Sequence, residues 1–194
     1  MLNEGYLTGQ LLIAMPTLGD DRFDHSVIFI CSHNEDGAMG LVINETTDEL
    51  TFIELLEQLE IISGQEEIMY EGLSDEVPIY AGGPVEQGRG FILHSSDYKL
   101  ASTLEINKDI SLTATAEILS AIVNNEGPEK YLIALGYAGW SSGQLEAEIN
   151  QNSWLTVEAD PDLLFGCDIQ LKWNNALAKL GINSSLLSAQ AGQA

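Results

Sequence analysis

The chain has few basic residues. Its 194 residues include 7 lysines and arginines but 30 aspartates and glutamates, which gives a formal net charge of -23. Nucleic-acid-binding proteins draw most of their affinity from lysine and arginine at phosphates, so direct nucleic-acid binding is not expected. The same charge disfavours an anionic membrane surface. Two interpretations of the acidity stay open: it keeps the protein soluble, or it attracts a basic protein partner.

Cysteine and histidine are also scarce. The 2 cysteines, Cys31 and Cys167, lie far apart and lack the C-x-x-C or histidine spacing of a zinc site. The sequence therefore predicts no metal and no cofactor, and both thiols are interpreted as buried or incidental ones in a reducing compartment. A redox-sensing Cys31 would need a neighbour that lowers its pKa, and His33, expected on the same strand face, is the local candidate.

Long hydrophobic runs are missing as well. The apolar run near the N-terminus covers only residues 11–15 and has no basic segment before it. We therefore expect neither a signal peptide nor a transmembrane span, no membrane contact, and a cytoplasmic location. Internal repeats and Pro/Ser-rich linkers are lacking too. The sequence predicts one domain over residues 1–183 and a loosely held C-terminal tail over residues 184–194.

Short apolar runs separated by turn residues predict strands in mainly antiparallel order. The predicted strands cover residues 10–15, 26–31, 38–44, 77–81, 90–94, 131–137 and 154–157. Residues 131–137 are almost continuously apolar, which indicates a central strand covered on both faces. Helical spacing appears in residues 50–62, 112–125 and 144–150 and in a last segment from Asp160 to Gly181. Thr51 and Glu54 are spaced as a capping box for the first helix.

Residues 139–143 read Gly-Trp-Ser-Ser-Gly, a literal G-x-S-x-G. This pattern would make Ser141 the nucleophile of a hydrolase, but the 3 histidines all precede Ser141, whereas that hydrolase fold places its histidine later. The same residues fit a capped turn, with Ser141 as N-cap and Gln144 as its partner. A small hydrolase or nucleotide-binding enzyme that uses Ser141 or the segment His94 to Asp97 remains the alternative hypothesis.

Two further patterns resemble sites without their full chemistry. Gly83 to Gly88 has the spacing of a phosphate loop but lacks the lysine and the following helix, so a structural turn is favoured. Asp20, Asp21, Asp24, His25 and His33 are possible metal donors whose spacing matches no defined site. Such clusters arise easily in so acidic a chain.

Four long motifs follow one another along the chain. They are GQLLIAMPTLGDDRFDHSVIFICSHNEDGAMGLVIN (residues 9–44), YAGGPVEQGRGFILHS (80–95), LGYAGWSSGQLEAEINQNSWL (135–155) and ADPDLLF (159–165). In this order they resemble the YqgE/AlgH family of bacterial proteins over nearly the whole chain. The resemblance implies an α+β fold: a single domain whose mainly antiparallel, bifurcated sheet forms a pseudo-barrel flanked by helices.

The resemblance implies no active site. The family pattern reads GYAGWGAGQLE, with glycine where this chain has Ser141, and His25 stands where the family often has a basic residue. Both departures argue against catalysis at these positions. The name AlgH reflects a proposed regulatory role in alginate production, so the resemblance implies a role in transcriptional regulation, which the acidity of this chain makes indirect.

These observations favour a non-enzymatic cytoplasmic protein that acts through a protein partner or a small ligand, with no catalytic residues. Glycine-rich turns after strands can expose backbone donors to a ligand. A ligand site is therefore expected where the turns at residues 16–24, 82–85 and 139–142 come together. The predicted ligand-binding residues are Pro16, Asp24, His25, Gly82, Gly83, Gly139 and Trp140.

Overall fold

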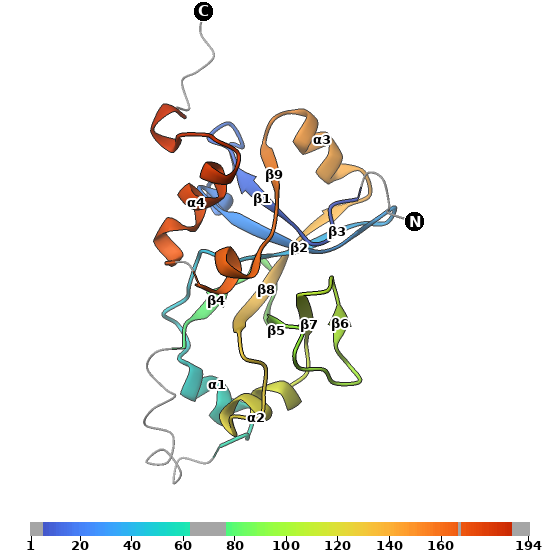
Figure 1. Cartoon of the computed structure of the whole chain (residues 1–194), viewed down its shortest axis with the longest axis vertical. Helices are drawn as coiled ribbons and strands as arrows, with labels where there is room; N and C mark the ends of the chain where they lie inside the picture. The colour runs from blue at the N-terminus through green and yellow to red at the C-terminus, as the bar shows by residue number, and fades with distance from the viewer. Residues whose placement is uncertain (1–5, 63–76, 167, 188–194) are drawn as a thin grey trace, which may run out of the picture.

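The computed structural model describes residues 6–62, 77–166 and 168–187. Within them, one nine-stranded sheet has the order β6-β7-β5-β8-β3-β2-β1-β9, and β4 joins β8 as a parallel neighbour. The other strand pairs are antiparallel. Figure 1 shows the sheet curling through the molecule, with helices at both ends. The predicted fold class is confirmed: one α+β domain with a mostly antiparallel, curled sheet.

The elements follow the predicted order with several new bounds. The strands are β1 (Gln10–Ala14), β2 (Val27–Asn34), β3 (Gly37–Val42), β4 (Ile79–Ala81), β5 (Val85–Ser95), β6 (Leu104–Glu105), β7 (Ile110–Thr113), β8 (Tyr131–Ser141) and β9 (Trp154–Glu158). The α-helices are α1 (Phe52–Gln58), α2 (Glu117–Val123), α3 (Gln144–Asn150) and α4 (Lys172–Lys179). Shorter helical turns are η1 (Asp21–Phe23), η3 (Asp162–Gly166), η4 (Ile169–Leu171) and η5 (Ser184–Leu186).

Strand β8 connects the two parts of the sheet (Figure 1). Its first half pairs with β5 on one side and β4 on the other, and its last four residues pair with β3. Gly136 lies between these halves with a φ of +70°, a backbone conformation that glycine adopts without strain. The bend at Gly136 turns the second half of β8 toward another set of strands, which makes the sheet bifurcated.

The turn at Gly82 and Gly83 fills the fork of the sheet. The Gly82 N–H donates to the Leu135 carbonyl at 2.8 Å, and the Gly82 carbonyl accepts from the Val42 N–H at 2.9 Å. A side chain at Gly83 would place its Cβ 2.1 Å from the carbonyl carbon of Tyr137. Two glycines are therefore needed here because backbone packs directly on backbone.

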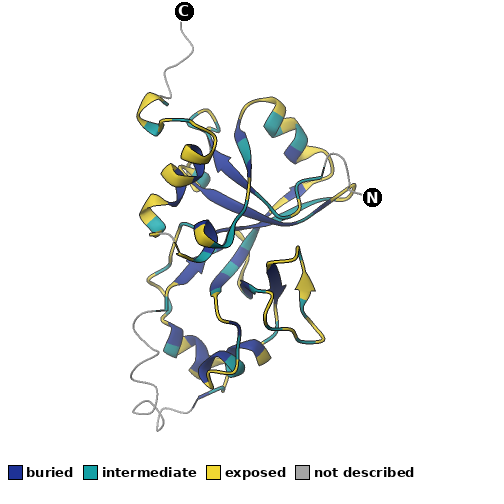
Figure 2. Ribbon diagram, viewed as in Figure 1, coloured by how far each residue is buried: buried dark blue, intermediate teal, exposed yellow. Residues whose placement is uncertain are grey.

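Three apolar clusters cover the faces of the sheet. Alternate residues of β1 and β2 point to opposite sides, as the two-residue period of a strand requires. Leu11 and Phe29 pack with Trp173 of α4, whereas Leu12 and Ile28 pack with Leu145 of α3. Helices α1 and α2 cover the outer face of β5 and the first half of β8. Figure 2 shows β1 and most of β2 buried, whereas β6 is exposed. In β8, Leu132 and Ile133 belong to different clusters, which confirms that its first half is central and covered on both faces.

The predicted helix over residues 112–125 is wrong in its first part. Leu112 lies in β7, which pairs with β5, and α2 begins only at Glu117. Asn107 closes the turn before β7 by accepting hydrogen bonds from the N–H groups of Asp109 and Ile110. This tertiary pairing with β5 overrides the helical spacing of the apolar residues.

The predicted last helix is interrupted. Asp160 accepts a hydrogen bond from the Leu163 N–H, as expected of a cap, but η3 ends at Gly166 and α4 begins only at Lys172. The Asp168 side chain caps η4 between them, and this local hydrogen bond competes with a continuous helix. The structural turn expected from Gly83 to Gly88 is also shorter than predicted, since β5 begins at Val85.

Two predictions concern the end of the chain. Residues 184–186 of the predicted tail form η5, which Asn183 caps. Residues 188–194 and Cys167 lie outside the described residues. The predicted domain boundary at residue 183 and the burial of Cys167 therefore stay predictions.

Candidate functional site

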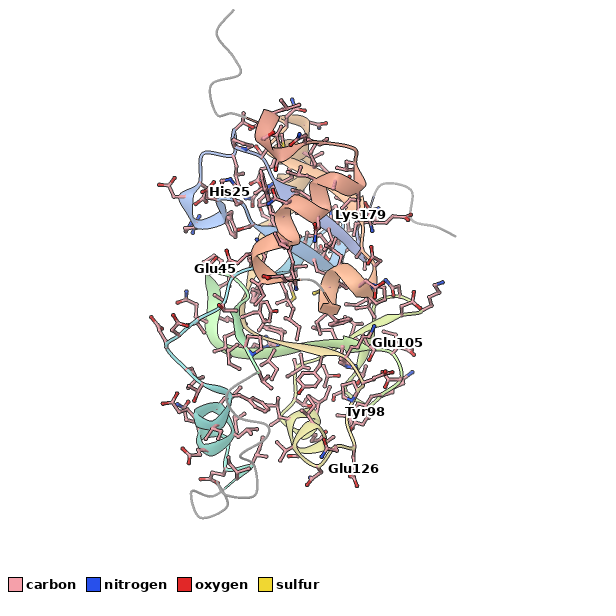
Figure 3. The ribbon with its side chains drawn as sticks, turned by 60° about the vertical axis from the view of Figure 1, so that its left-hand side comes forward. His25, Glu45, Tyr98, Glu105, Glu126 and Lys179 are labelled. Carbon is pink, nitrogen blue, oxygen red and sulfur yellow. The ribbon has the colours of Figure 1, made fainter. Side chains whose placement is uncertain are left out.

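A cleft of about 560 Å³ lies beside His25, and we call it the His25 cleft. Three segments line it: η1 with the residues after it, the residues that follow β3, and η4 with α4. Its lining residues are Asp21, Arg22, Asp24, His25, Ser26, Asn44, Glu45, Ile169, Gln170, Trp173 and Asn174. Figure 3 shows His25 and Glu45 on the same side of the molecule, which brings residues far apart in sequence to one surface.

The wall of the His25 cleft formed by η1 is fixed by short-range hydrogen bonds. The Asp20 carboxylate accepts from the Arg22 backbone N–H and from its guanidinium, and these bonds lower the pKa of Asp20. Arg22 is therefore paired with Asp20, although it lines the cleft. Its charge is largely offset before any ligand is considered.

His25 is held in place on several sides. It has a positive φ of 55°, and its carbonyl accepts a hydrogen bond from the Asn44 amide at 2.9 Å. The His25 Nδ1 lies 2.8 Å from a carboxylate oxygen of Asp24, and its ring meets the edge of Trp173 with the ring centres 4.4 Å apart. More than half of the His25 side chain, 57%, is still exposed. A ligand in the cleft can therefore reach a positioned imidazole.

The charged side chains of the His25 cleft are mostly acidic. Asp21, Asp24 and Glu45 line it, and Arg22 is already paired with Asp20. Carboxylates gathered on a concave surface raise the local concentration of cations. The cleft is therefore suited to a positively charged group.

A second hollow of about 230 Å³ adjoins the His25 cleft. It shares Arg22 and Glu45 with that cleft, and Gly83 and Pro84 form another part of its wall. Two of the three predicted turns thus border joined hollows that carry ionisable side chains. Asp24, His25 and Gly83 line them, whereas Pro16 and Gly82 do not.

The third predicted turn, residues 139–142, lines neither of these hollows. Trp140 is buried, and its indole N–H donates to the same Glu148 oxygen as the indole N–H of Trp154, at 2.9 Å and 2.8 Å. Phe23 meets Trp154 edge-on at 5.9 Å between ring centres. Gly139 is exposed and pairs with Met39 in the sheet. Gly139 and Trp140 line neither hollow, so the expected meeting of all three turns at one cavity is not seen.

Ser141 has the contacts of a structural residue. Its hydroxyl and its backbone N–H both donate to the side-chain carbonyl of Gln144, at 3.1 Å and 3.0 Å. The predicted N-cap is wrong, however, because Gly143, with a φ of +74°, precedes the first residue of α3 and Ser141 ends β8. Gly143 occupies the N-cap position because the backbone there is left-handed, a conformation that glycine adopts without strain.

His94 is fully buried and does not face a serine. Its Nδ1 lies 2.8 Å from the Ser95 carbonyl, which can only accept, so this nitrogen carries a proton and Nε2 accepts from the Thr113 hydroxyl. Burial lowers the pKa of His94, which favours its neutral form. The Ser95 hydroxyl donates to Asp97 instead. These contacts do not form the serine-histidine-aspartate relay.

Cys31 is buried in the core, as predicted, and burial raises the pKa of its thiol. The expectation that His33 shares its strand face is wrong. A register shift between Ile30 and Ser32 places His33 opposite Ala38, on the side of the sheet away from Cys31. The His33 Nδ1 accepts from the Leu7 N–H, and its Nε2 lies 3.1 Å from Glu146.

Two kinds of feature are absent from the described residues. No three histidine, cysteine, aspartate or glutamate side chains there lie together as a metal site would require. Over the same part of the chain, no helix has the length and apolar character needed to cross a membrane.

Sequence reasoning missed Glu45 and Trp173, which complete the His25 cleft. Glu45 follows a predicted strand and Trp173 lies within the predicted last helix, so neither has a signal of its own. Only the folded chain brings them next to His25.

The fold and the cleft define a single-domain α+β protein with a forked, curled sheet and a polar surface cleft. The AlgH-like family profile matches residues 11–185, and the chain belongs to this family. This confirms the resemblance stated from the motifs.

Similar sequences and solved structures support the same family and fold. A UPF0301 protein of Rhodopseudomonas palustris is 52% identical over 190 residues, which cover 97% of this chain and 87% of that protein. The solution structure of the AlgH protein from Pseudomonas aeruginosa is 44% identical, covers 100% of this chain and 99% of that one, and superposes with a TM-score of 0.78. A protein from Corynebacterium diphtheriae shares the fold at 19% identity and a TM-score of 0.66, over 89% of this chain and 86% of that one.

Proposed function

We propose that the protein is a non-enzymatic, cytoplasmic regulatory protein that acts by binding a protein partner or a small ligand in the His25 cleft. One observation carries this proposal. Residues from two turns far apart in sequence, represented by His25 and Gly83, border joined hollows that contain ionisable side chains. Concave sites with a few converging polar groups are the usual place for ligand contacts.

The charge of the cleft indicates what it would bind. Among the described residues that line the cleft, Arg22 is the only lysine or arginine beside Asp24 and Glu45, and it pairs with Asp20. The contact is therefore made with a cationic group: an organic cation, or a lysine or arginine of a partner. Charge attraction of this kind mainly increases the rate of association and weakens with salt.

The non-enzymatic part of the proposal is supported by the contacts of the two candidate segments. The Ser141 hydroxyl donates to Gln144, and the ring of His94 is bonded to Thr113 and to a backbone carbonyl. Neither arrangement pairs a nucleophile with a base. The regulatory part rests on the family resemblance. The net charge of -23 makes regulation through direct contact with DNA unfavourable.

Affinity capture from a lysate of the native host, at low and moderate salt, tests the proposal. The bait is the full chain as wild type, as Asp24→Asn/Glu45→Gln, and as the control Glu105→Gln/Glu126→Gln. Both double variants remove two carboxylates, but Glu105 and Glu126 lie away from His25 (Figure 3). We expect a partner that wild type and control retain and the cleft variant loses, more readily at moderate salt.

Small ligands are tested by thermal unfolding with a panel of organic cations, including spermidine and agmatine. A ligand at a hundred times its dissociation constant stabilises the folded state by about 2.7 kcal/mol. The stabilisation should disappear in Asp24→Asn/Glu45→Gln and persist in the control. Absence of any partner or ligand that distinguishes the two double variants would contradict the proposal.

A further inference from the structure

Another concave surface lies between α1 and β5, at the opposite end of the joined hollows from His25. We call it the Leu59 groove. It has a volume of about 450 Å³ and is lined by Thr47, Glu49, Leu50, Leu55, Gln58, Leu59, Ala81, Gly83, Gln87, Gly88 and Leu135. A smaller hollow of about 120 Å³ shares four of these residues and extends the groove to α2. Figure 1 shows α1 and α2 side by side at this end of the molecule.

The floor of the Leu59 groove is apolar. Leu50, Leu55, Leu59 and Leu135 contribute to it, and the Leu59 side chain is 43% exposed. Leu59 is well positioned, because its backbone N–H donates to the Leu55 carbonyl at the end of α1. Exposed apolar surface that is concave and held in place is typical of a binding groove.

The wall opposite α1 comes from an irregular part of β5. Val85 pairs with Tyr137 and Gly90 pairs with Leu135, so residues 86–89 lie outside the ladder as a bulge. A Cβ added at Gly88 would meet no atom within 4 Å. Gly88 lines both the groove and the smaller hollow, and the fold leaves space for a side chain at this position.

The rim of the groove has one sign of charge. Glu49 lines the groove, and residues 48–60, which surround α1, include four further carboxylates and no lysine or arginine: Asp48, Glu54, Glu57 and Glu60. On the opposite wall, Arg89 is paired with Glu86 at 3.1 Å. A second copy of this chain, with a net charge of -23, would bring like charges together at such a contact. The complementary occupant is apolar at its centre and basic at its edges.

We infer that the Leu59 groove binds a segment of a partner protein that carries a few apolar side chains flanked by lysine or arginine. The apolar side chains pack on Leu55, Leu59 and Leu135, and the basic ones pair with the carboxylates of the rim. Peptide recognition by a groove commonly combines anchors of these two kinds. The inference does not depend on the His25 cleft, because neither Leu59 nor Gly88 lines it.

Selection of short random peptides displayed on phage, with the full-length protein as target, tests the inference. We expect the enriched peptides to combine leucine-like side chains with lysine or arginine. Synthetic versions should bind Gly88→Leu at least about tenfold more weakly than wild type, because the new side chain fills the groove. Replacing their basic residues with glutamate should abolish binding.

Matched variants separate the groove from general attraction to an acidic protein. Gly166→Leu makes the same substitution at another open glycine, and Leu171→Ser matches Leu59→Ser at another exposed leucine. Binding should be unchanged in the controls and weakened in Leu59→Ser. Failure to enrich any peptide, or peptides that bind Gly88→Leu as tightly as wild type, would overturn the inference. Neither result bears on the His25 cleft, whose test uses Asp24 and Glu45.

Discussion

The fork of the sheet can be tested by the substitution Gly83→Ala. Gly83 has a φ of +153°, and an added Cβ would lie 2.1 Å from the Tyr137 carbonyl carbon and 2.4 Å from the Ala138 nitrogen. All of these neighbours are backbone atoms, so no change of rotamer can relieve the contact. Either the turn must move away from β8 or β8 must straighten.

The cost follows from two separate effects. Holding alanine in a sparsely populated backbone conformation costs about 1–3 kcal/mol. Forcing extra volume into a closely packed site costs about 1–3 kcal/mol more. We therefore expect Gly83→Ala to lower the free energy of unfolding by roughly 4 kcal/mol, a large part of the total stability of an ordinary domain. The corresponding fall in Tm is roughly 8–16 °C for a chain of this size.

Thermal and urea unfolding followed by circular dichroism measures this difference. Gly88→Ala, five residues further along the chain, is the control, because its Cβ meets no atom within 4 Å and its change should stay within about 0.5 kcal/mol. Gly136→Ala places a Cβ 2.4 Å from the Gly83 carbonyl oxygen, so the double variant should lose less stability than the two single losses added. A Gly83→Ala protein as stable as Gly88→Ala would refute the reasoning.

Three further outcomes are expected. Ser141→Ala should leave any background ester hydrolysis unchanged, measured with a chromogenic ester, and a loss of turnover would revive the hydrolase hypothesis. Cys31 should react with iodoacetamide on the order of 100-fold more slowly in the folded than in the urea-unfolded protein, by peptide mass spectrometry, because burial raises its pKa and blocks access. The pKa of His94 in the folded state lies below its ordinary value of 6.5, so the unfolded chain binds this proton more readily. The contribution of His94 to folding stability is therefore complete above about pH 6.5 and is lost as the pH falls toward the folded pKa. Between these two pH values His94→Gln should lose less stability per pH unit than wild type in urea unfolding. Equal pH dependence of the two proteins would contradict the lowered pKa.

The order of elements could be predicted because it depends on local patterns. The capping box at Thr51 and Glu54 forms as expected, and the bounds of α3 agree with the prediction. The segment before α2 was mistaken for helix because its apolar spacing fits both structures, and only pairing with β5 decides for the strand. The bulge that turns His33 away from Cys31 has no signal in the sequence either.

The candidate site was predictable only in part. His25 and Gly83 belong to turns whose glycine and aspartate content marks them as loops, and loops commonly carry contacts. The role of Gly82 is different from the one expected, because both of its backbone groups bond to neighbouring strands in the fork. Trp140 belongs to the third glycine-rich turn expected at the site, but its indole bonds to Glu148 inside the packing. Which turns share a surface depends on the curvature of the sheet.

The central claim is that a ligand or partner binds in the His25 cleft. Amide chemical shifts of the isotope-labelled full chain, followed while a captured partner or an active organic cation is added, test it most directly. The account predicts the largest changes at His25, Glu45 and Trp173, and their loss in Asp24→Asn/Glu45→Gln. Changes confined to the distant surface around Glu105 and Glu126, with those three amides unmoved, would contradict it.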